Sequence, residues 1–348
     1  YVASRGCNKH GDIWHTQAQD ELSGKLFTVR SKAVINACGP EVDPVNNINA
    51  QTTDCKHLLS KGIHLIVDRI TPAERVLAFF ASDGRLFFVI PMGPKTCIGT
   101  TDTQVDTPTT HVTAEDRAFV LENANALLAL DKPITEADII AERCGVRPLA
   151  QTGGAEVADW VALSRKHIIE ADTANNYLSI FGGKLTDCIN VGEEIVEHVN
   201  AMGVSVSYPT KKWYGEADDS VKQEFEHQAK LLELDAMTDP TSSEPLTTRL
   251  WRRYGANALE ILEGIRENPT RAKLLIENAE YLRGEIELAG RREMITKLED
   301  FLRRRSKISL VVKGDDVINA PGLKIACEIL FGDEAEAKLA EYVESLRH

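Results

Sequence analysis

The feature that most constrains the fold is a change of periodicity near Val206. Before this residue, short apolar runs alternate with glycine-rich and proline-rich turns, a pattern typical of β-strands. After it, apolar residues recur at helical spacing and strand patterns nearly vanish. With 348 residues, the chain is also long enough for two or more domains. We therefore expect a strand-rich part followed by a separate all-helical domain at 206–348.

The first segment resembles the closing strands of a domain. KLFTVR at 25–30 and AVINA at 33–37 predict two strands, and the second is nearly continuous in apolar residues. Such a run is typical of a strand that is buried on both faces. A buried strand needs neighbouring strands, and only residues 1–32 precede this one. We therefore expect an upstream part of this domain to be absent from the chain.

The next segment predicts an antiparallel sheet. Residues 46–60 are polar and predict a loop with a short helix. The expected strands are KGIHLIV at 61–67, RVLAFFA at 75–81, GRLFFVIP at 84–91 and KTCIGT at 95–100. Asp83-Gly84 separates two of these apolar runs, which is a strong signal for a hairpin.

Helices and strands then alternate before the helical region begins. Residues 114–130 predict an amphipathic helix capped by Thr113. Three further strands are expected at 160–164, 167–171 and 177–181, followed by a helix over 186–202. In the helical region, periodicity predicts helices at 218–236, 245–266, 270–283, 285–307 and 320–346.

Composition excludes some classes of function. The formal net charge is -13, which argues against general affinity for nucleic acid, because phosphate binding needs a basic surface. The seven cysteines are scattered and form no C-x-x-C pair, so we expect reduced thiols in a cytoplasmic protein and no metal site. No run approaches the ~20 apolar residues of a membrane span. Peripheral contact with a membrane stays open.

Two glycine-containing turns are candidates for cofactor binding. VINACGP at 34–40 is a strand that ends in a small-residue turn, where Gly39 lets the backbone approach a ligand closely. FGGKLTD at 181–187 leads from a strand through two glycines into a helix, which favours an anionic or electron-rich ligand. Lys184 adds a positive charge there. Each motif alone is equally compatible with a simple tight turn.

Several side chains are candidates for substrate binding. Arg147 lies in the extended segment GVRPL, where its guanidinium suits a phosphate or a carboxylate, although a structural ion pair is an alternative. Arg165 ends a strand in SRKH, and His64 lies in the apolar strand KGIHLIV. Thr101 and Asp102 follow a strand in GTTD, a pattern that also occurs in side-chain turns.

The order of these motifs is more specific than any one of them. The series is VINACGP, KGIHLIV, DGRLFFVIPMG, CIGTTDT, GVRPL, SRKH, IFGGKLTD and, in the helical tail, DFLRRRSKIS at 300–309. It resembles the FAD-dependent glycerol-3-phosphate dehydrogenase family, the flavoenzymes of respiratory glycerol catabolism. The resemblance covers nearly the whole chain and is strongest from Val34 to about Asp187 and again at 300–309.

The resemblance implies an α+β or α/β fold of the glycine-oxidase type with three parts. These are a remnant of a Rossmann-like FAD domain, an antiparallel-sheet substrate domain and a C-terminal all-helical domain. The implied boundaries are 1–45 and 182–205 for the FAD domain, 46–181 for the substrate domain and 206–348 for the helical domain.

The resemblance also implies a reaction and a set of site residues. Glycerol 3-phosphate would be oxidised to dihydroxyacetone phosphate by hydride transfer to FAD, and the electrons would pass to a quinone. The residues expected along the flavin are Gly39, Gly182, Gly183, Lys184, Leu185 and Thr186. The residues expected around the substrate are His64, Arg147, Arg165, Thr101 and Asp102, with Arg147 on the phosphate. Of these, His64 is the candidate base, and Arg165 and Lys184 are the other candidate catalytic groups.

The sequence departs from the family pattern in three places. The N-terminal G-x-G-x-x-G motif and an upstream phosphate-binding arginine are missing, and Asp187, Cys188 and Ile189 stand where relatives have an aromatic residue and an arginine. Two alternatives stay open: another flavin-dependent amine or 2-hydroxy-acid oxidase, or a non-catalytic fragment. Oxygen as electron acceptor, a homodimer and peripheral attachment to the inner face of a membrane are also compatible with the resemblance.

Overall fold

The computed structural model describes residues 1–153, 166–207, 217–240 and 242–346. It divides the chain into two compact units. The first comprises Tyr1–Ile63, Thr101–His111 and Cys144–Lys212. The second comprises His64–Thr100, Val112–Arg143 and Trp213–His348. The strand expected at 160–164 and Arg165 lie outside the described residues.

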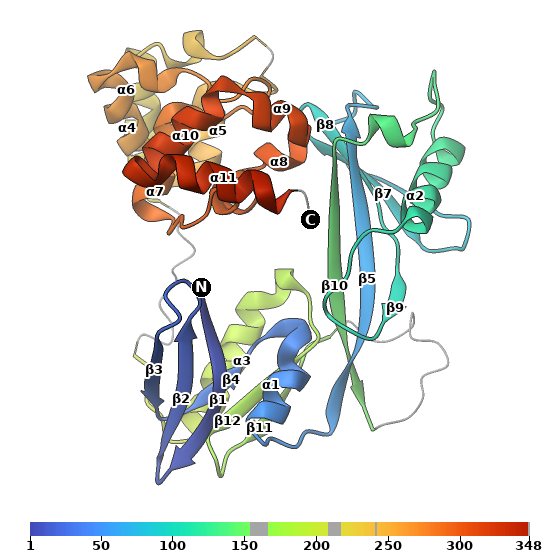
Figure 1. The fold of residues 1–348 in the computed structure, drawn as a ribbon, viewed down its shortest axis with the longest axis vertical. Helices are drawn as coiled ribbons and strands as arrows, with labels where there is room; N and C mark the ends of the chain where they lie inside the picture. Colours follow the sequence, from blue (N-terminus) through green and yellow to red (C-terminus); the bar gives the residue numbers. More distant parts are fainter. Residues whose placement is uncertain (154–165, 208–216, 241, 347–348) are drawn as a thin grey trace. The chain divides into compact units, whose positions relative to one another are not determined.

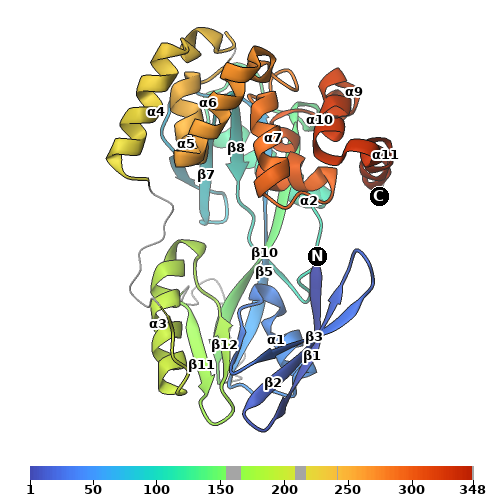
Figure 2. The same ribbon diagram turned by 90° about the vertical axis from the view of Figure 1, so that its left-hand side faces the viewer.

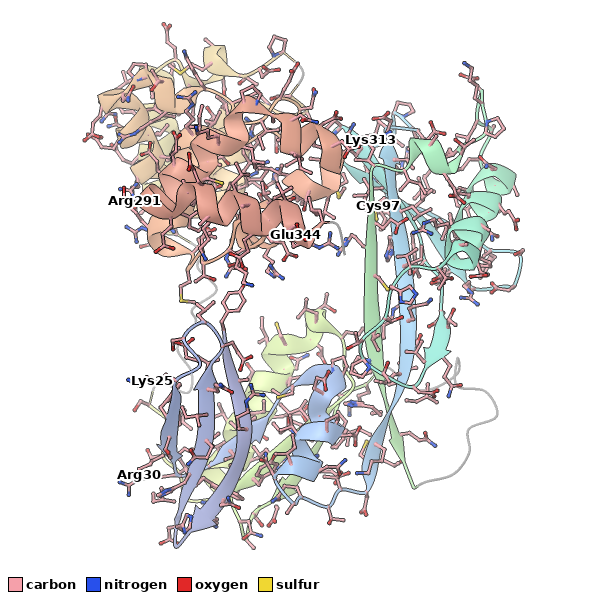
Figure 3. The ribbon with its side chains drawn as sticks, in the orientation of Figure 1. Lys25, Arg30, Cys97, Arg291, Lys313 and Glu344 are labelled. Atoms are coloured by element: carbon pink, nitrogen blue, oxygen red, sulfur yellow. The ribbon has the colours of Figure 1, made fainter. Side chains whose placement is uncertain are left out.

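An antiparallel three-stranded sheet begins the first unit. It is formed by β1 (Val2–His10), β2 (Ile13–Asp20) and β3 (Leu26–Ser31), in that order. Trp14 of β2 is buried and packs against Tyr177 of another sheet in the same unit. The side chains of β3 are largely exposed, and Figure 3 shows Arg30 projecting away from the sheet. The expected strand at 25–30 is therefore confirmed.

A second three-stranded sheet in this unit has the order β11-β12-β4. β11 (Ile168–Asp172) and β12 (Tyr177–Phe181) are antiparallel, whereas β4 (Val34–Asn36) runs parallel to β12. α1 (Val42–Ile48) packs against β12 and β4, and Figure 1 shows it beside this sheet.

The expectation that the strand at 33–37 is buried on both faces is wrong. Ile35 keeps 43% of its surface exposed, whereas the neighbouring Asn36 is buried and donates to Oδ1 of Asn46 on α1. Successive side chains on a strand point to opposite faces, so Ile35 points away from α1. Among the described residues, β4 is also the edge strand of its sheet.

A six-stranded sheet has the order β10-β5-β8-β7-β6, with β9 beside β5. Its strands are β5 (Cys55–Asp68), β6 (Leu77–Phe80), β7 (Leu86–Met92), β8 (Lys95–Gly99), β9 (Thr103–Val105) and β10 (Ala141–Thr152). β6 and β7 form the hairpin expected at Asp83-Gly84, where Gly84 has a positive φ of 84°. The expected loop at 46–60 is too long, because β5 already begins at Cys55.

Thr113 caps α2 (Ala114–Leu127) in the second unit, as expected. Its hydroxyl accepts from the backbone N–H of Asp116, whose carboxylate in turn accepts from the N–H of Thr113. This reciprocal pair satisfies two amides that the first helical turn leaves without partners.

The C-terminal part of the second unit is helical (Figures 1 and 2). Its helices are α4 (Asp219–Leu231), α5 (Leu246–Tyr254), α6 (Ala258–Glu267), α7 (Arg283–Arg292), α8 (Ile308–Val311), α9 (Gly314–Asn319), α10 (Pro321–Phe331) and α11 (Ala335–Ser345). One apolar cluster joins α4, α5 and α6, and a second joins α7, α8, α10 and α11. No described helix is both long and apolar enough to cross a membrane.

The helix expected at 270–283 is wrong. After a single turn at Pro269–Ala272 the chain becomes irregular, and Leu274 and Leu282 pair in an isolated antiparallel bridge. Asn278 and Glu280 both have positive φ values, 62° and 55°, which a right-handed helix does not allow. The apolar residues here are buried because they pack against the neighbouring helices, so their spacing does not report a helix.

Substitution of Gly322 tests how closely α10 packs in this region. A Cβ added at Gly322 would overlap the backbone carbonyl of Leu275, which cannot move aside as a flexible side chain can. We expect Gly322→Ala to lower the free energy of unfolding by at least about 1–3 kcal/mol in urea denaturation. Gly314→Ala is the matched control, because nothing lies within 4 Å of its added Cβ. Equal stability of the two variants would contradict the packing described.

Candidate functional site

A turn of two glycines connects β12 to α3 (Cys188–Ala201) in the first unit. Gly182 has φ 63° and Gly183 has φ 87°, values that L side chains rarely adopt. A single 3-10 turn at Leu185–Asp187 then begins the helix. The backbone conformation of the turn therefore favours glycine at both positions of the FGGKLTD motif.

The turn is packed closely on its inner side. A Cβ added at Gly182 would lie 3.1 Å from Cβ of Ala150 on β10, and one added at Gly183 would lie 2.9 Å from Cβ of His167. The next residues are open to solvent: Lys184 is exposed, and Leu185 exposes 91% of its surface. The turn is thus closely packed on one side, and Lys184 lies exposed on the other.

Arg147 lies on β10, and its guanidinium occupies the space that a side chain at Gly62 would fill. A Cβ added at Gly62 of β5 would overlap the guanidinium of Arg147. Nη1 of Arg147 lies 3.3 Å from the carbonyl oxygen of Thr101 and 3.4 Å from Oδ1 of Asp102. The side chain keeps 30% of its surface exposed, so a ligand can reach it.

Thr101 and Asp102 connect Arg147 to β5. Oγ1 of Thr101 accepts from the backbone N–H of Ile63 at 3.1 Å, and Ser60 donates to Oδ1 of Asp102. The predicted residues Thr101 and Asp102 therefore contact β5 and Arg147. Their observed contacts anchor the arginine.

A cavity of about 350 Å³ brings two of the predicted motifs together. Its lining residues are Val146, Arg147, Pro148, Leu149, Gly183, Lys184 and Leu185. Arg147 comes from the GVRPL motif and Lys184 from FGGKLTD, so two cationic side chains line one cavity. Paired cations beside apolar side chains suit a small organic anion such as a phosphate ester or a carboxylate.

Other predicted residues lie elsewhere. His64 belongs to the second unit, where it is half-buried and pairs in register with Gly99 of β8. Gly39 follows β4 with φ 57°, and a Cβ added there would meet nothing within 4 Å. Thr186 is exposed next to the cavity-lining Leu185. Arg165 is outside the described residues.

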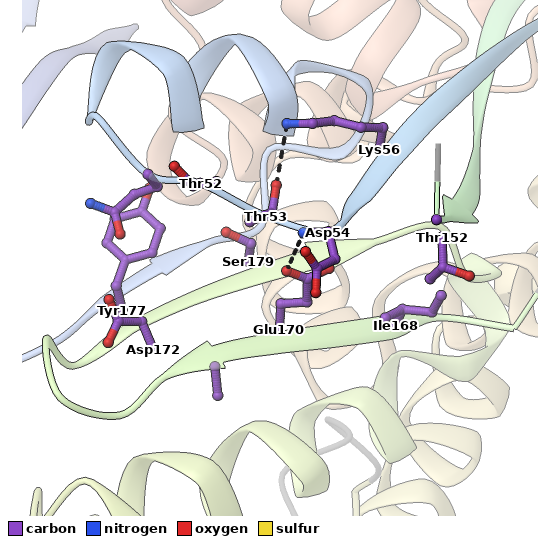
Figure 4. Close-up of a pocket in the computed structure, with 13 residues that line it drawn as sticks. Thr52, Thr53, Asp54, Lys56, Thr152, Ile168, Glu170, Asp172, Tyr177 and Ser179 are labelled. Atoms are coloured by element: carbon purple, nitrogen blue, oxygen red, sulfur yellow. Dashed lines mark hydrogen bonds between the residues drawn. The ribbon is translucent and has the colours of Figure 1, made fainter. Parts of the chain in front are cut away.

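A larger cavity of about 960 Å³ contains none of the predicted site residues (Figure 4). It lies between β11, β12 and the segment that precedes β5. Glu170 accepts from the backbone N–H groups of Asp54 and Cys55 at its edge, at 3.0 and 2.5 Å. The threonines and carboxylates that line this cavity are scattered along the sequence, so no motif indicated the cavity.

Sequence reasoning also missed two buried histidines beside the glycine turn. Nε2 of His57 accepts from the backbone N–H of Gly182 at 3.0 Å. Nδ1 of His167 lies 2.9 Å from Oδ2 of Asp187 at the start of α3. Hydrogen bonds from Asn190 and His167 hold the pKa of Asp187 below its usual range. His57 belongs to none of the motifs, and His167 ends the SRKH motif, in which only Arg165 was singled out. Only the fold brings the two histidines to the turn.

Two family models match the chain. Residues 5–184 match the model of the FAD-dependent oxidoreductases, which is more than half of the chain. Residues 223–320 match the C-terminal domain of alpha-glycerophosphate oxidase. The second match lies within the helical part of the second unit.

Curated proteins and solved structures are similar over most of the chain. Glycerol-3-phosphate dehydrogenase from a Synechocystis strain is 29% identical over 89% of this chain and 58% of its own length. Aerobic glycerol-3-phosphate dehydrogenase from Staphylococcus aureus is 29% identical over 97% of this chain and 61% of its own length. The chain thus spans about three fifths of these relatives.

The glycerol-3-phosphate dehydrogenase from Bacillus halodurans, solved in complex with FAD, superposes with a TM-score of 0.72. It is 24% identical and aligns over 100% of this chain and 68% of its own, so it supports the fold. The two family matches coincide with the strand-rich part and the helical part of the chain. The chain belongs to the family of FAD-dependent oxidoreductases.

Proposed function

We propose that the chain is part of an enzyme that oxidises glycerol 3-phosphate to dihydroxyacetone phosphate with FAD. The observation that carries this proposal is the cavity in which Arg147 and Lys184 lie together. The names of the curated relatives support this substrate, as does the match of the helical domain to that of an alpha-glycerophosphate oxidase.

In this proposal Arg147 binds the phosphate of the substrate. Asp102 and the carbonyl of Thr101 hold one edge of its guanidinium, which fixes its direction. A fixed guanidinium forms charge-assisted hydrogen bonds to phosphate oxygens and loses little freedom in doing so. Arg165 would provide a second cation, as the resemblance to the glycerol-3-phosphate dehydrogenases implies.

The glycine turn fits a flat cofactor placed against the backbone. Its outer side is open at Lys184, Leu185 and Thr186, and the position of a Cβ on Gly39 is also open space. We propose that these four residues, with Gly182 and Gly183, contact FAD. Bound FAD would accept the hydride from C2 of the substrate. Lys184 would stabilise negative charge beside the cavity.

His64 is the proposed base. It lies two residues after Gly62 on β5, and Gly62 makes room for Arg147. A neutral imidazole can take the proton of the C2 hydroxyl as the hydride leaves, because its ordinary pKa is near 6.5. The phosphate contact of Arg147 would limit the positions that the C2 hydroxyl can adopt.

We also propose a division of labour along the chain. Residues 1–45 and 182–205 would contribute to the FAD site, 46–181 to the substrate site, and 206–348 would form the helical domain. A quinone would accept the electrons, at the inner face of a membrane, and the enzyme would be a homodimer. Comparing a soluble quinone with oxygen as oxidant of the reduced enzyme tests the acceptor, and peroxide formation would favour oxygen.

Arg147→Ala tests the phosphate contact in the FAD-loaded enzyme. We expect KM for glycerol 3-phosphate to rise roughly 10- to 100-fold, as for the loss of a charge-assisted hydrogen bond. Steady-state kinetics measure this effect. Arg30→Ala is the control, because Arg30 projects from β3 into solvent (Figure 3). Unchanged kinetics in Arg147→Ala would contradict the proposed phosphate site.

His64→Ala tests the base. We expect flavin reduction by saturating glycerol 3-phosphate to slow by roughly 100- to 10,000-fold, the usual range for general base catalysis. Single-turnover absorbance measurements separate this step from reoxidation. His227→Ala is the control, since His227 is exposed on α4. A reduction rate equal to that of the unmodified enzyme would remove His64 from this role.

A further inference from the structure

The turn at Gly182 and Gly183 is fixed by a side chain that lies far away in the sequence. Nε2 of His57 accepts the backbone N–H of Gly182 at 3.0 Å. The imidazole is 2% exposed, and its ring centroid lies 5.1 Å from that of Phe181, the last residue of β12. Water therefore has little access to the imidazole and cannot easily replace this hydrogen bond.

The bond requires one particular form of the imidazole. Because Nε2 is the acceptor, the proton of the neutral ring must be on Nδ1. Nδ1 lies 3.4 Å from Oδ2 of Asp43 on α1, close enough for attraction although the two atoms form no hydrogen bond. Asp43 is held in turn by the backbone N–H of His57 at 2.9 Å and by Nζ of Lys56 at 3.5 Å.

Burial favours the neutral form of the His57 imidazole, which can accept this hydrogen bond. Desolvation lowers the pKa of His57, and the negative charge of Asp43 opposes that shift only in part. A protonated ring would present an N–H to the N–H of Gly182, and the two donors would repel. The neutral ring is therefore matched to the turn at neutral pH.

We propose that His57 is a positioning residue that fixes the Gly182–Gly183 turn and thereby sets where Lys184 stands at the cavity. The close packing of Gly182 on Ala150 and of Gly183 on His167 leaves the turn without room to shift inward. The hydrogen bond that Gly182 donates to His57 directs the first N–H of the turn toward β5 and so fixes the backbone where the turn begins. The consequence for catalysis rests on the proposed function.

Amide hydrogen exchange tests this role without any assumption about activity. The peptide that contains 178–187 is followed in the unmodified chain, in His57→Leu, which cannot accept, and in His57→Gln, which can. We expect exchange at Gly182 to be about 5- to 30-fold faster in His57→Leu, as for the loss of one hydrogen bond, and nearly unchanged in His57→Gln. Equal exchange in all three proteins would overturn the proposal.

The pH dependence of the unmodified chain gives a second readout that does not require His57→Leu to fold. The contribution of neutral His57 is fully present above the ordinary histidine pKa of about 6.5 and is lost as pH falls toward the lowered pKa. Exchange at Gly182, corrected for intrinsic rates, should therefore accelerate below that pH. It should not accelerate in His57→Gln. The same acid response in both proteins would count against His57.

Kinetics of the FAD-loaded enzyme then separate positioning from substrate binding. His57→Leu should slow flavin reduction at saturating glycerol 3-phosphate while KM, which depends on Arg147, stays within about twofold, and His57→Gln should restore the rate. If exchange responds as expected but the unmodified enzyme never reduces flavin with this substrate, the proposed function fails and the positioning of the turn stands. A rise of KM alone in His57→Leu would contradict the link to Lys184.

Discussion

Two adjacent residues in the left-handed backbone region are the constraint on which the candidate site depends. Gly182 and Gly183 let the chain turn sharply from a buried strand into α3. A side chain at either position would be strained, and at Gly183 it would also lie against His167. The turn is therefore narrow on its inner side and open on its outer side. This asymmetry makes the backbone accessible to a ligand and presents Lys184 at the cavity.

A third glycine, Gly62, positions the other cation of the cavity. Gly62 leaves space on β5 that the guanidinium of Arg147 occupies, and Asp102 and Thr101 also contact that guanidinium. The two cations of the cavity are thus positioned by the absence of side chains at three places in the chain. Oriented cations in a partly enclosed space suit a small organic anion, and the proposed substrate, a phosphate ester, belongs to this class.

The positions of several strands and of α2 were predictable because turn residues such as Asp83-Gly84 and capping residues such as Thr113 act locally. The helix expected at 270–283 was wrong because residues such as Leu275 and Ile276 are buried by neighbouring helices. The expected burial of the strand at 33–37 on both faces was wrong because, among the described residues, none packs over Ile35 closely enough to bury it. Arg147 and the glycine turn, which line one cavity, had been predicted as site residues from their motifs. His57 was not, because its partner Gly182 lies 125 positions away and no local pattern connects them.

The most direct test of the central claim is anaerobic addition of glycerol 3-phosphate to the chain in the presence of FAD, followed by visible absorbance. The account predicts loss of the oxidised-flavin bands with glycerol 3-phosphate and no loss with glycerol, which lacks the phosphate that Arg147 would bind. Bleaching by an amino acid or a 2-hydroxy acid but not by glycerol 3-phosphate would contradict the account and assign the two cations to a carboxylate. Flavin that stays oxidised with every substrate would contradict the proposal that these residues assemble a working site.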